Sequence, residues 1–185
     1  MKKKYFTAFC LLLVCFFLAN FYAAYIETHF KEEEITESFC REIILENYAE
    51  PKPPVEIVGI EKVGNVICVG YLIGTEIKHG NRLIFVKNDT ENSRYVLTET
   101  YATRMWEEEE KISICSFGEG SADGEGAAEY YVVLSHNPQL TAIEVRQDDE
   151  KNLIPINKNP SMTLVEIPSK KRSSYFSINY VLNEN

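Results

Sequence analysis

The hydrophobic and polar positions divide the chain into a long apolar N-terminal run, a short amphipathic stretch and a series of brief apolar runs. Between Tyr5 and Ile26 the only clearly polar side chains are Thr7 and Asn20. A helix of about 20 residues, rising about 1.5 Å per residue, crosses the roughly 30 Å hydrocarbon core of a bilayer. Residues 1–26 therefore predict a basic cytoplasmic head followed by a transmembrane signal-anchor.

A cleavable signal peptide is the main alternative for this segment. Such signals have a shorter apolar core and small residues at the cleavage site. The bulky Phe21 and Tyr22 directly before Ala23 match that site poorly, and Val14 before Cys15 fits a lipoprotein processing site poorly. The pattern favours an uncleaved anchor.

Residues 27–50 contain no glycine or proline and place Phe39, Ile43 and Ile44 at helical spacing opposite a glutamate-rich face. This spacing predicts a juxtamembrane helical stalk, although Thr36 could cap a shorter helix that begins near Ser38. The prolines of residues 51–54 (PKPP) cannot continue a helix, so they predict a linker between the stalk and the rest of the chain.

From residue 55 the pattern changes to short β-branched and aromatic runs separated by turn residues, which is typical of antiparallel sheets. The run 66–73 is apolar at every position and predicts a central strand. Residues 55–185 thus predict an all-β head, an antiparallel β-sandwich that is immunoglobulin-like or related. The expected strands are 55–63, 66–73, 82–87, 94–101, 111–117, 129–135, 141–147, 153–156, 163–167 and 174–182.

Turn residues lie between these runs. The pairs Gly64–Asn65, Gly80–Asn81, Asn137–Pro138 and Asp148–Asp149 each predict a hairpin connection. Residues 101–110 predict a short helical turn or a loop, with the single tryptophan, Trp106, packed beneath it.

The distribution of charge predicts the orientation in the membrane. Three lysines precede the apolar run and five glutamates follow it within residues 27–37, so the basic end is expected in the cytoplasm and the C-terminal domain outside. Without those lysines the chain has 16 basic and 28 acidic residues, a net charge of about −12. This balance excludes nucleic acid as a partner and leaves the membrane itself and an envelope protein or glycan.

Three cysteines lie in the part expected outside the membrane. Cys68 and Cys115 fall within strand runs, where either a disulfide bridge or two buried thiols is possible. Cys40 lies on the predicted stalk, where it could pair with a second copy of the chain or remain a solitary thiol.

No residue pattern predicts a metal or cofactor site. The Gly118–Glu129 loop carries Glu119, Asp123, Glu125 and Glu129 among glycines, but these acids lack the offsets of a calcium-binding loop. The tract Glu107–Glu110 predicts a solvated turn. The histidines are far apart in sequence, and there is no H-x-x-x-H or C-x-x-C pair to build a zinc site.

No catalytic residue is assigned either. His79 and His136 lie at predicted strand ends, and Ser135 precedes His136, but neighbouring residues of a strand point to opposite faces and no serine has a nucleophile elbow around it. An exposed aromatic cluster would suit glycan or protein binding. The candidates, most of them expected in the core, are Tyr71, Tyr95, Tyr101, Trp106, Tyr130, Tyr131, Tyr175 and Phe176.

The C-terminal third carries a family resemblance. The stretch Tyr130–Tyr180 contains YYVVLSHNPQLTAIEVRQDDEKNLIPI, then EIPSK and SYFSINY. It resembles a pattern in uncharacterised single-pass exported proteins of low-GC Gram-positive bacteria, in which a strand leads through an N-P turn to I-x-x-I/V-E-V and a D-x-x-K/N-x hairpin. Asp148, Asp149 and Glu150 stand here in place of the glycine-containing D-G-K turn. The resemblance implies no activity.

These features predict a membrane-anchored, extracytoplasmic binding or interaction module without catalytic activity. Two alternatives remain open. One is an envelope hydrolase or transferase whose site, centred on His136, His79 or the acids of Gly118–Glu129, forms only in three dimensions. The other is a structural subunit of a membrane complex.

Overall fold

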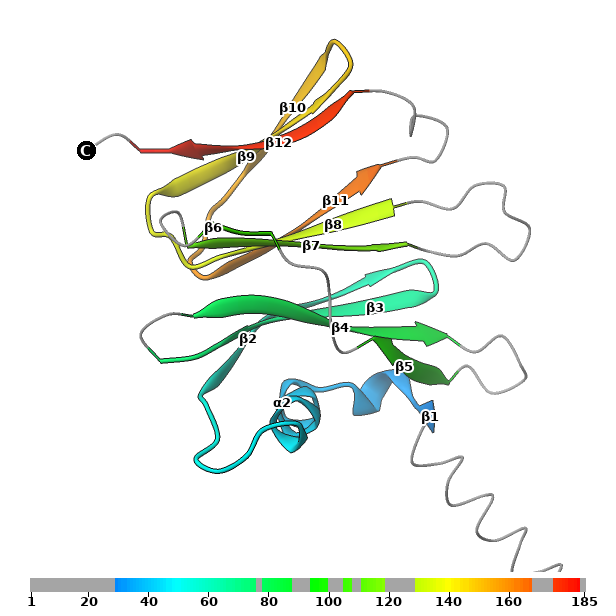
Figure 1. Cartoon of the computed structure of the whole chain (residues 1–185). Coiled ribbons are helices and arrows are strands. Elements are labelled where there is room, and N and C mark those ends of the chain that lie inside the picture. Colours follow the sequence, from blue (N-terminus) through cyan, green and yellow to red (C-terminus); the bar gives the residue numbers. More distant parts are fainter. Residues whose placement is uncertain are drawn as a thin grey trace, which may run out of the picture.

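The computed structural model of the chain describes residues 29–75, 78–87, 94–99, 105–107, 111–118, 129–167 and 175–183 (Figure 1). For residues 99 and 105–107 only the backbone is described. The predicted signal-anchor at residues 1–26 lies outside these ranges. Within them, no helix is both long and apolar enough to cross a membrane.

Most of the described chain is antiparallel β-sheet, which confirms the predicted β-rich character of the chain, and each predicted strand overlaps an observed one. A 3₁₀ helix, η1 (Glu32–Glu34), and an α-helix, α2 (Glu37–Glu46), complete the elements. The strands are β1 (His29–Phe30), β2 (Val55–Val63), β3 (Val66–Ile73), β4 (His79–Lys87), β5 (Tyr95–Glu99), β6 (Met105–Glu107), β7 (Ile112–Gly118), β8 (Glu129–Ser135), β9 (Leu140–Gln147), β10 (Glu150–Pro155), β11 (Ser161–Ile167) and β12 (Phe176–Leu182).

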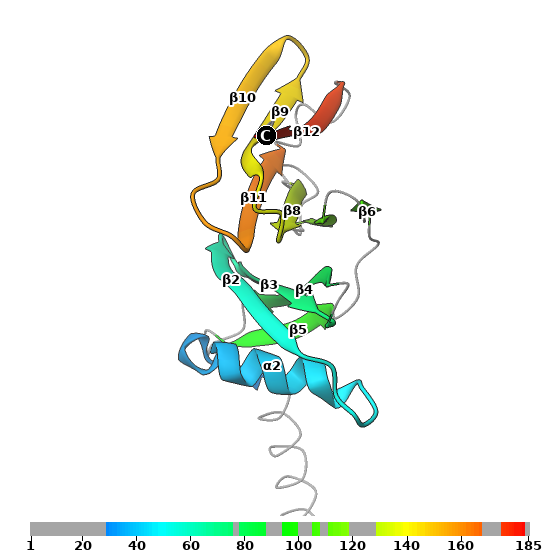
Figure 2. The same ribbon diagram turned by 90° about the vertical axis from the view of Figure 1, so that its left-hand side faces the viewer.

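The strands form three sheets rather than the two of a simple sandwich. A five-stranded sheet has the order β1-β5-β4-β3-β2, a four-stranded sheet β11-β8-β7-β6 and a three-stranded sheet β10-β9-β12. The sheets are stacked, and α2 covers the free face of the five-stranded one (Figures 1 and 2). The order of layers is therefore helix, five strands, four strands, three strands.

A hydrophobic core fills each gap between layers. Because successive side chains of a strand point to opposite faces, β3 supplies Val69 and Tyr71 to the core beneath α2, and Cys68 and Leu72 to the core against the four-stranded sheet. Every residue of β3 is buried, which confirms its prediction as a central strand. A third core, around Ile143, joins the four-stranded and three-stranded sheets.

Helix α2 lies within the residues predicted as a stalk. Thr36 caps it, and its side-chain hydroxyl accepts a hydrogen bond from the backbone N–H of Phe39 at 3.4 Å. The apolar face of an amphipathic helix is buried against another element. Here that face packs on the five-stranded sheet, where Cys40 and Ile44 are buried in the core. Helix α2 is thus part of the folded stack rather than a freestanding stalk.

Two short strands and one glycine differ from the predictions. Strand β1 pairs with β5, and β6 pairs with β7 within the segment predicted as a helical turn or loop, because long-range pairing rather than local pattern fixes such short strands. The Trp106 side chain lies outside the described residues. Gly80–Asn81 is a buried part of β4 and not a turn; glycine is needed there because the four-stranded sheet comes very close.

The three predicted turns that remain are confirmed. Gly64–Asn65 joins β2 to β3, Asn137–Pro138 lies between β8 and β9, and Asp148–Asp149 joins β9 to β10. Asp148 has a φ of 53°, a conformation that aspartate tolerates better than most residues other than glycine.

The three-stranded sheet is the end of the stack farthest from α2. Strand β1, where the described chain begins, lies at the helix-covered end, and β9, β10 and β12 lie at the other (Figures 1 and 2). The outer face of this sheet has no covering layer among the described residues, and Leu153 and Val181 on it are 53% and 37% exposed. We call this the distal end of the protein.

Candidate functional site

The structure separates the residues weighed as catalytic. His79 begins β4, next to Gly80, whose missing Cβ would face Ser113 of the four-stranded sheet. Neighbouring residues alternate in direction, so the His79 side chain lies on the other face of its sheet, the face that α2 covers. His136 follows β8 of the four-stranded sheet, and its backbone N–H donates to the carbonyl of Lys111 at 3.2 Å. The two histidines therefore do not converge.

Ser135 has a structural role. Its hydroxyl oxygen accepts a hydrogen bond from the backbone N–H of Asn137 at 3.0 Å, and its side chain is buried. The bond stabilises the turn between β8 and β9. This placement leaves Ser135 and His136 without the geometry of a nucleophile and its base.

His136 does lie near a carboxylate and two lysines. Burial lowers the pKa of its imidazole, opposed by a hydrogen bond with the backbone of Lys78 and by the charge of Glu56, while the nearby cations Lys111 and Lys78 lower the pKa further. Glu56 and Lys78 form an ion pair at 2.7 Å and line a cavity of about 170 Å³ next to Pro54. His136 is not among the residues that line this cavity.

Most residues of the acidic segments lie outside the described chain. Of the Gly118–Glu129 loop only the two ends are described, and residues 108–110 of the glutamate tract are not. Among the described residues, no group of three or more histidine, cysteine or acidic side chains could hold a metal ion.

The described aromatic residues mainly fill the cores. Tyr71, Tyr95 and Tyr130 are at most 5% exposed. Tyr131 packs against Phe176 between the four-stranded and three-stranded sheets, with ring centroids 5.2 Å apart. Tyr175 is 72% exposed, and Tyr101 and the Trp106 side chain lie outside the described residues. These positions offer no aromatic binding surface.

The three cysteines within the described residues are buried thiols. Cys40, Cys68 and Cys115 are each at most 1% exposed, and none of them forms a disulfide. Burial raises the pKa of the Cys40 and Cys68 thiols to about 12, with a small opposing effect of Arg82 on Cys68. Cys40 is therefore not placed to pair with a second copy of the chain.

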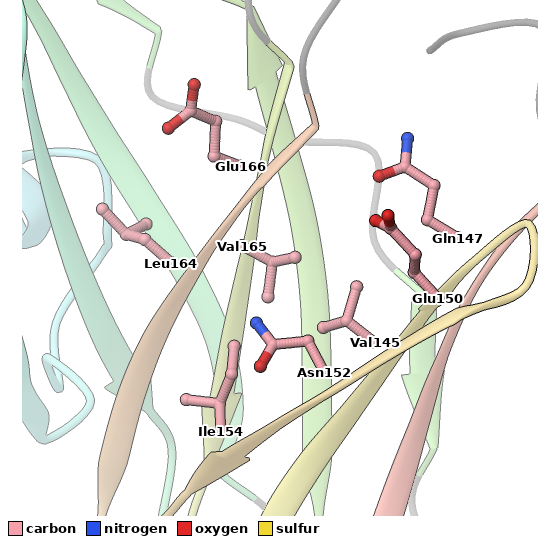
Figure 3. Close-up of a pocket in the computed structure, with 8 residues that line it drawn as sticks. All are labelled: Val145, Gln147, Glu150, Asn152, Ile154, Leu164, Val165 and Glu166. Carbon is pink, nitrogen blue, oxygen red and sulfur yellow. The ribbon is translucent and has the colours of Figure 1, made fainter.

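A groove lies at the distal end, between β10 and β11. Its volume is about 320 Å³, the lower end of the range for ligand sites. Gln147, Glu150 and Glu166 lie toward one end of it and Ile154 toward the other (Figure 3). We call this the distal groove; its lining residues are Val145, Gln147, Glu150, Asn152, Ile154, Leu164, Val165 and Glu166.

The lining of the distal groove combines an apolar floor with polar groups. Val145 and Ile154 belong to the core around Ile143, so the floor continues that core to the surface. The Nε2 atom of Gln147 is buried and has no hydrogen-bond acceptor among the described residues. A buried donor left in this way costs about 1–3 kcal/mol.

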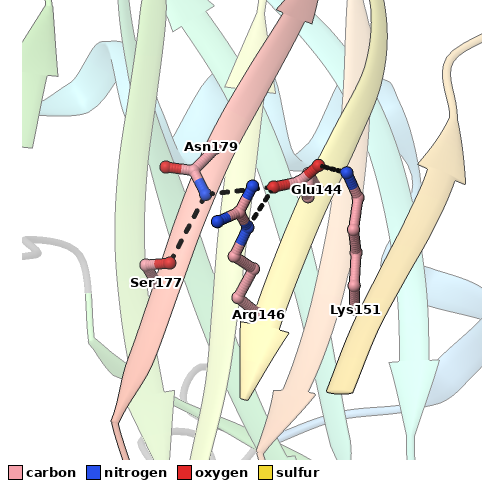
Figure 4. Close-up of polar contacts among 5 residues, drawn as sticks. All are labelled: Glu144, Arg146, Lys151, Ser177 and Asn179. Carbon is pink, nitrogen blue, oxygen red and sulfur yellow. Dashed lines mark hydrogen bonds and ion pairs between the residues drawn. The ribbon is translucent and has the colours of Figure 1, made fainter. Parts of the chain in front are cut away.

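A polar cluster lies on the opposite, outer face of the same sheet. The buried carboxylate of Glu144 accepts from Arg146 and forms an ion pair with Lys151, and Asn179 donates to it at 3.5 Å and to Ser177 at 3.4 Å (Figure 4). The bond from Lys151 and the charges of both cations hold the pKa of Glu144 below its usual range. We call these five residues the outer polar cluster; they fix β10 and β12 to β9.

Sequence reasoning missed the distal groove. Its lining residues are ordinary strand residues, and they meet only because β10 and β11, consecutive in the chain, belong to different sheets. The one signal present was Glu166, a charged residue within an otherwise mainly apolar run. Comparisons of the chain with protein-family models, curated proteins and solved structures give no match.

Proposed function

We propose that this chain is a membrane-anchored, extracytoplasmic β-sandwich that binds a partner through the distal groove and catalyses no reaction. The observation that carries this proposal is the position of the groove, at the end of the stack opposite β1 (Figures 1 and 2). A protein held at the membrane by an N-terminal helix would present that end outward.

Two further observations support binding rather than catalysis. The described residues that line the groove are hydrophobic and neutral polar side chains with two carboxylates, and none of them is a histidine, cysteine or serine. Its floor is continuous with a packed core, which holds together the strands that shape it. Preformed grooves bind at low entropic cost.

The test uses the full-length protein in its membrane. Protease added outside intact cells should degrade the C-terminal domain, and detergent should be needed to extract the chain. A partner should be enriched with the wild-type protein and lost with Asn152→Trp, which fills the groove, but kept with Asn157→Trp, an exposed residue outside the lining. Enrichment that is equal in both variants, or a domain protected in the cytoplasm, would contradict the proposal.

A second candidate, an envelope hydrolase or transferase, is favoured by one observation. His136 is hydrogen-bonded to the backbone of Lys78, which with Glu56 lines the smaller cavity. Hydrolysis by the full-length protein of ester, amide or glycosidic test substrates, abolished by His136→Ala and unchanged by Asn152→Trp, would establish it in place of the binding module.

A further inference from the structure

The distal groove runs along the edge of a strand and not across the face of a sheet. Leu164, Val165 and Glu166 are consecutive residues of β11, and all three line it. Consecutive side chains of a strand point to opposite faces. A cavity that lies beside the strand touches all three, and β11 is the last described strand of the four-stranded sheet.

The neighbouring three-stranded sheet lies over this edge of β11. Glu150, Asn152 and Ile154 of β10 alternate along one face of their strand, with Val145 and Gln147 beside them on β9, and all five line the groove. Val145 and Ile154 also pack in the core against the four-stranded sheet. The inner face of β10 and β9 therefore lies against the space next to β11, as Figure 3 shows.

The backbone of β11 is suited to pairing on this side. Among the described strands, β11 is the last of its sheet and pairs only with β8. An edge strand presents a row of N–H and C=O groups, and adding a partner strand to such an edge is an established mode of peptide recognition. Side chains on one face of an added strand would contact the inner face of β9 and β10, including the apolar Val145 and Ile154.

The chemistry of the lining selects among partners. Among the described residues that line the groove, Glu150 and Glu166 are carboxylates and none is basic, so the charge of this described lining favours a cation. No aromatic residue lines it, whereas a glycan would stack its sugar faces on aromatic rings. Four aliphatic side chains suit the alternating apolar side chains of a strand.

We propose that the distal groove binds an extended peptide segment of a partner protein, which pairs with β11 as a fifth strand of the four-stranded sheet and places a basic side chain near Glu150 and Glu166. The inference rests on the proposed function, because it assigns the partner of the same groove. It adds the mode of binding and the chemistry of the bound segment.

The test uses the full-length protein in detergent micelles with synthetic peptides. One peptide alternates valine and threonine and carries lysine at both ends. A second carries glutamate at both ends, and a third is the lysine peptide with alternate backbone amides methylated, so that it cannot pair with an edge strand. Titration calorimetry measures affinity, and hydrogen exchange measures protection of the amides of residues 161–167.

We expect the lysine peptide to bind and to slow exchange in residues 161–167. The glutamate and methylated peptides should bind the wild-type protein about tenfold more weakly than the lysine peptide does, or weaker still. The lysine peptide should lose affinity to the same extent when the protein carries Asn152→Trp or Glu166→Lys. Asn157→Trp and Glu42→Lys, an exposed helix residue at the other end of the stack, should leave binding unchanged.

Several results would overturn the inference. They are binding that survives Asn152→Trp, binding of the methylated peptide as tight as that of the lysine peptide, and no binding at all. Binding of the lysine peptide only after Lys170, Lys171 and Arg172 are replaced by serine would also overturn the inference. The occupant of the groove would then be the chain's own basic residues and not a partner protein. In each case, the proposed binding function would still stand if the partner enriched from cells were lost with Asn152→Trp. Only the peptide mode of binding would then be refuted.

Discussion

The backbone N–H of Gly80 in β4 donates a hydrogen bond to the hydroxyl of Ser113 in β7 at 3.0 Å, which ties the five-stranded sheet directly to the four-stranded one. A Cβ atom at position 80 would lie only 2.7 Å from both Cβ and Oγ of Ser113. The two sheets therefore meet here with no room for a side chain between them.

Gly80→Ala should accordingly destabilise the protein by about 1–3 kcal/mol, the usual cost of overpacking a core. Thermal unfolding followed by circular dichroism measures the change. Gly118→Ala is the matched control, because nothing lies within 4 Å of its added Cβ, and it should be close to neutral. Equal effects of the two substitutions would show that the sheets are not in contact at Gly80.

The buried cysteines should be unreactive in the folded protein. The thiolate is the reactive form of cysteine, and burial raises the pKa of Cys40 and Cys68 to about 12. In a chain with Cys10→Ser and Cys15→Ser, a thiol reagent at pH 8 should label no cysteine until denaturant is added, and then Cys40, Cys68 and Cys115. Mass spectrometry counts the labels. Rapid labelling without denaturant, or a Cys68–Cys115 disulfide, would contradict the buried positions.

The outer polar cluster should contribute an acid-sensitive part of the stability. Lys151 and Arg146 lower the pKa of Glu144 in the folded state. A carboxylate with a lowered folded pKa stabilises the fold above its unfolded value of about 4.3, and this contribution is lost as the pH falls below that value toward the folded pKa. Glu144→Gln should remove that loss, so its stability should fall less steeply than that of the wild type between about pH 5 and pH 3. Glu42→Gln is the control and should keep the wild-type slope.

His136 should also make the stability of the fold depend on pH, in a higher pH range than Glu144 does. Burial lowers its pKa in the folded state, so the folded protein disfavours the protonated imidazole. Stability should therefore decline as the pH falls below the unfolded value of about 6.5. His136→Gln should remove this decline, whereas His79→Gln should retain it. A stability profile between about pH 7 and pH 5 that is the same in wild type and His136→Gln would contradict the placement of His136.

Much of the secondary structure could be predicted from local pattern. The alternation of Phe176, Ile178 and Tyr180 marks β12, the apolar 66–73 run marks a central strand, and Thr36 marks the start of α2. These signals succeed because side-chain period and capping are properties of a few adjacent residues. The polar start of β10, from Glu150, escaped prediction because pairing with β9 defines it.

Features that depend on contact between distant residues could not be predicted. Gly80 followed by Asn81 has the local pattern of a turn, yet the glycine serves a close approach to Ser113. The amphipathic spacing of α2 predicted a helix, but as a stalk and not as a layer packed on the five-stranded sheet. The distal groove depends on strand order, which places the edges of β10 and β11 side by side, and no local pattern encodes that order.

The central claim, that the distal groove is the surface that meets a partner, is tested most directly by site-specific photocrosslinking in the native membrane. A photoreactive amino acid is placed at Asn152 in the full-length chain, and for comparison at Glu42 on α2. We expect one discrete crosslinked species from position 152, absent from position 42 and removed by an excess of the lysine peptide. No crosslink at position 152, or the same species from both positions, would contradict the account.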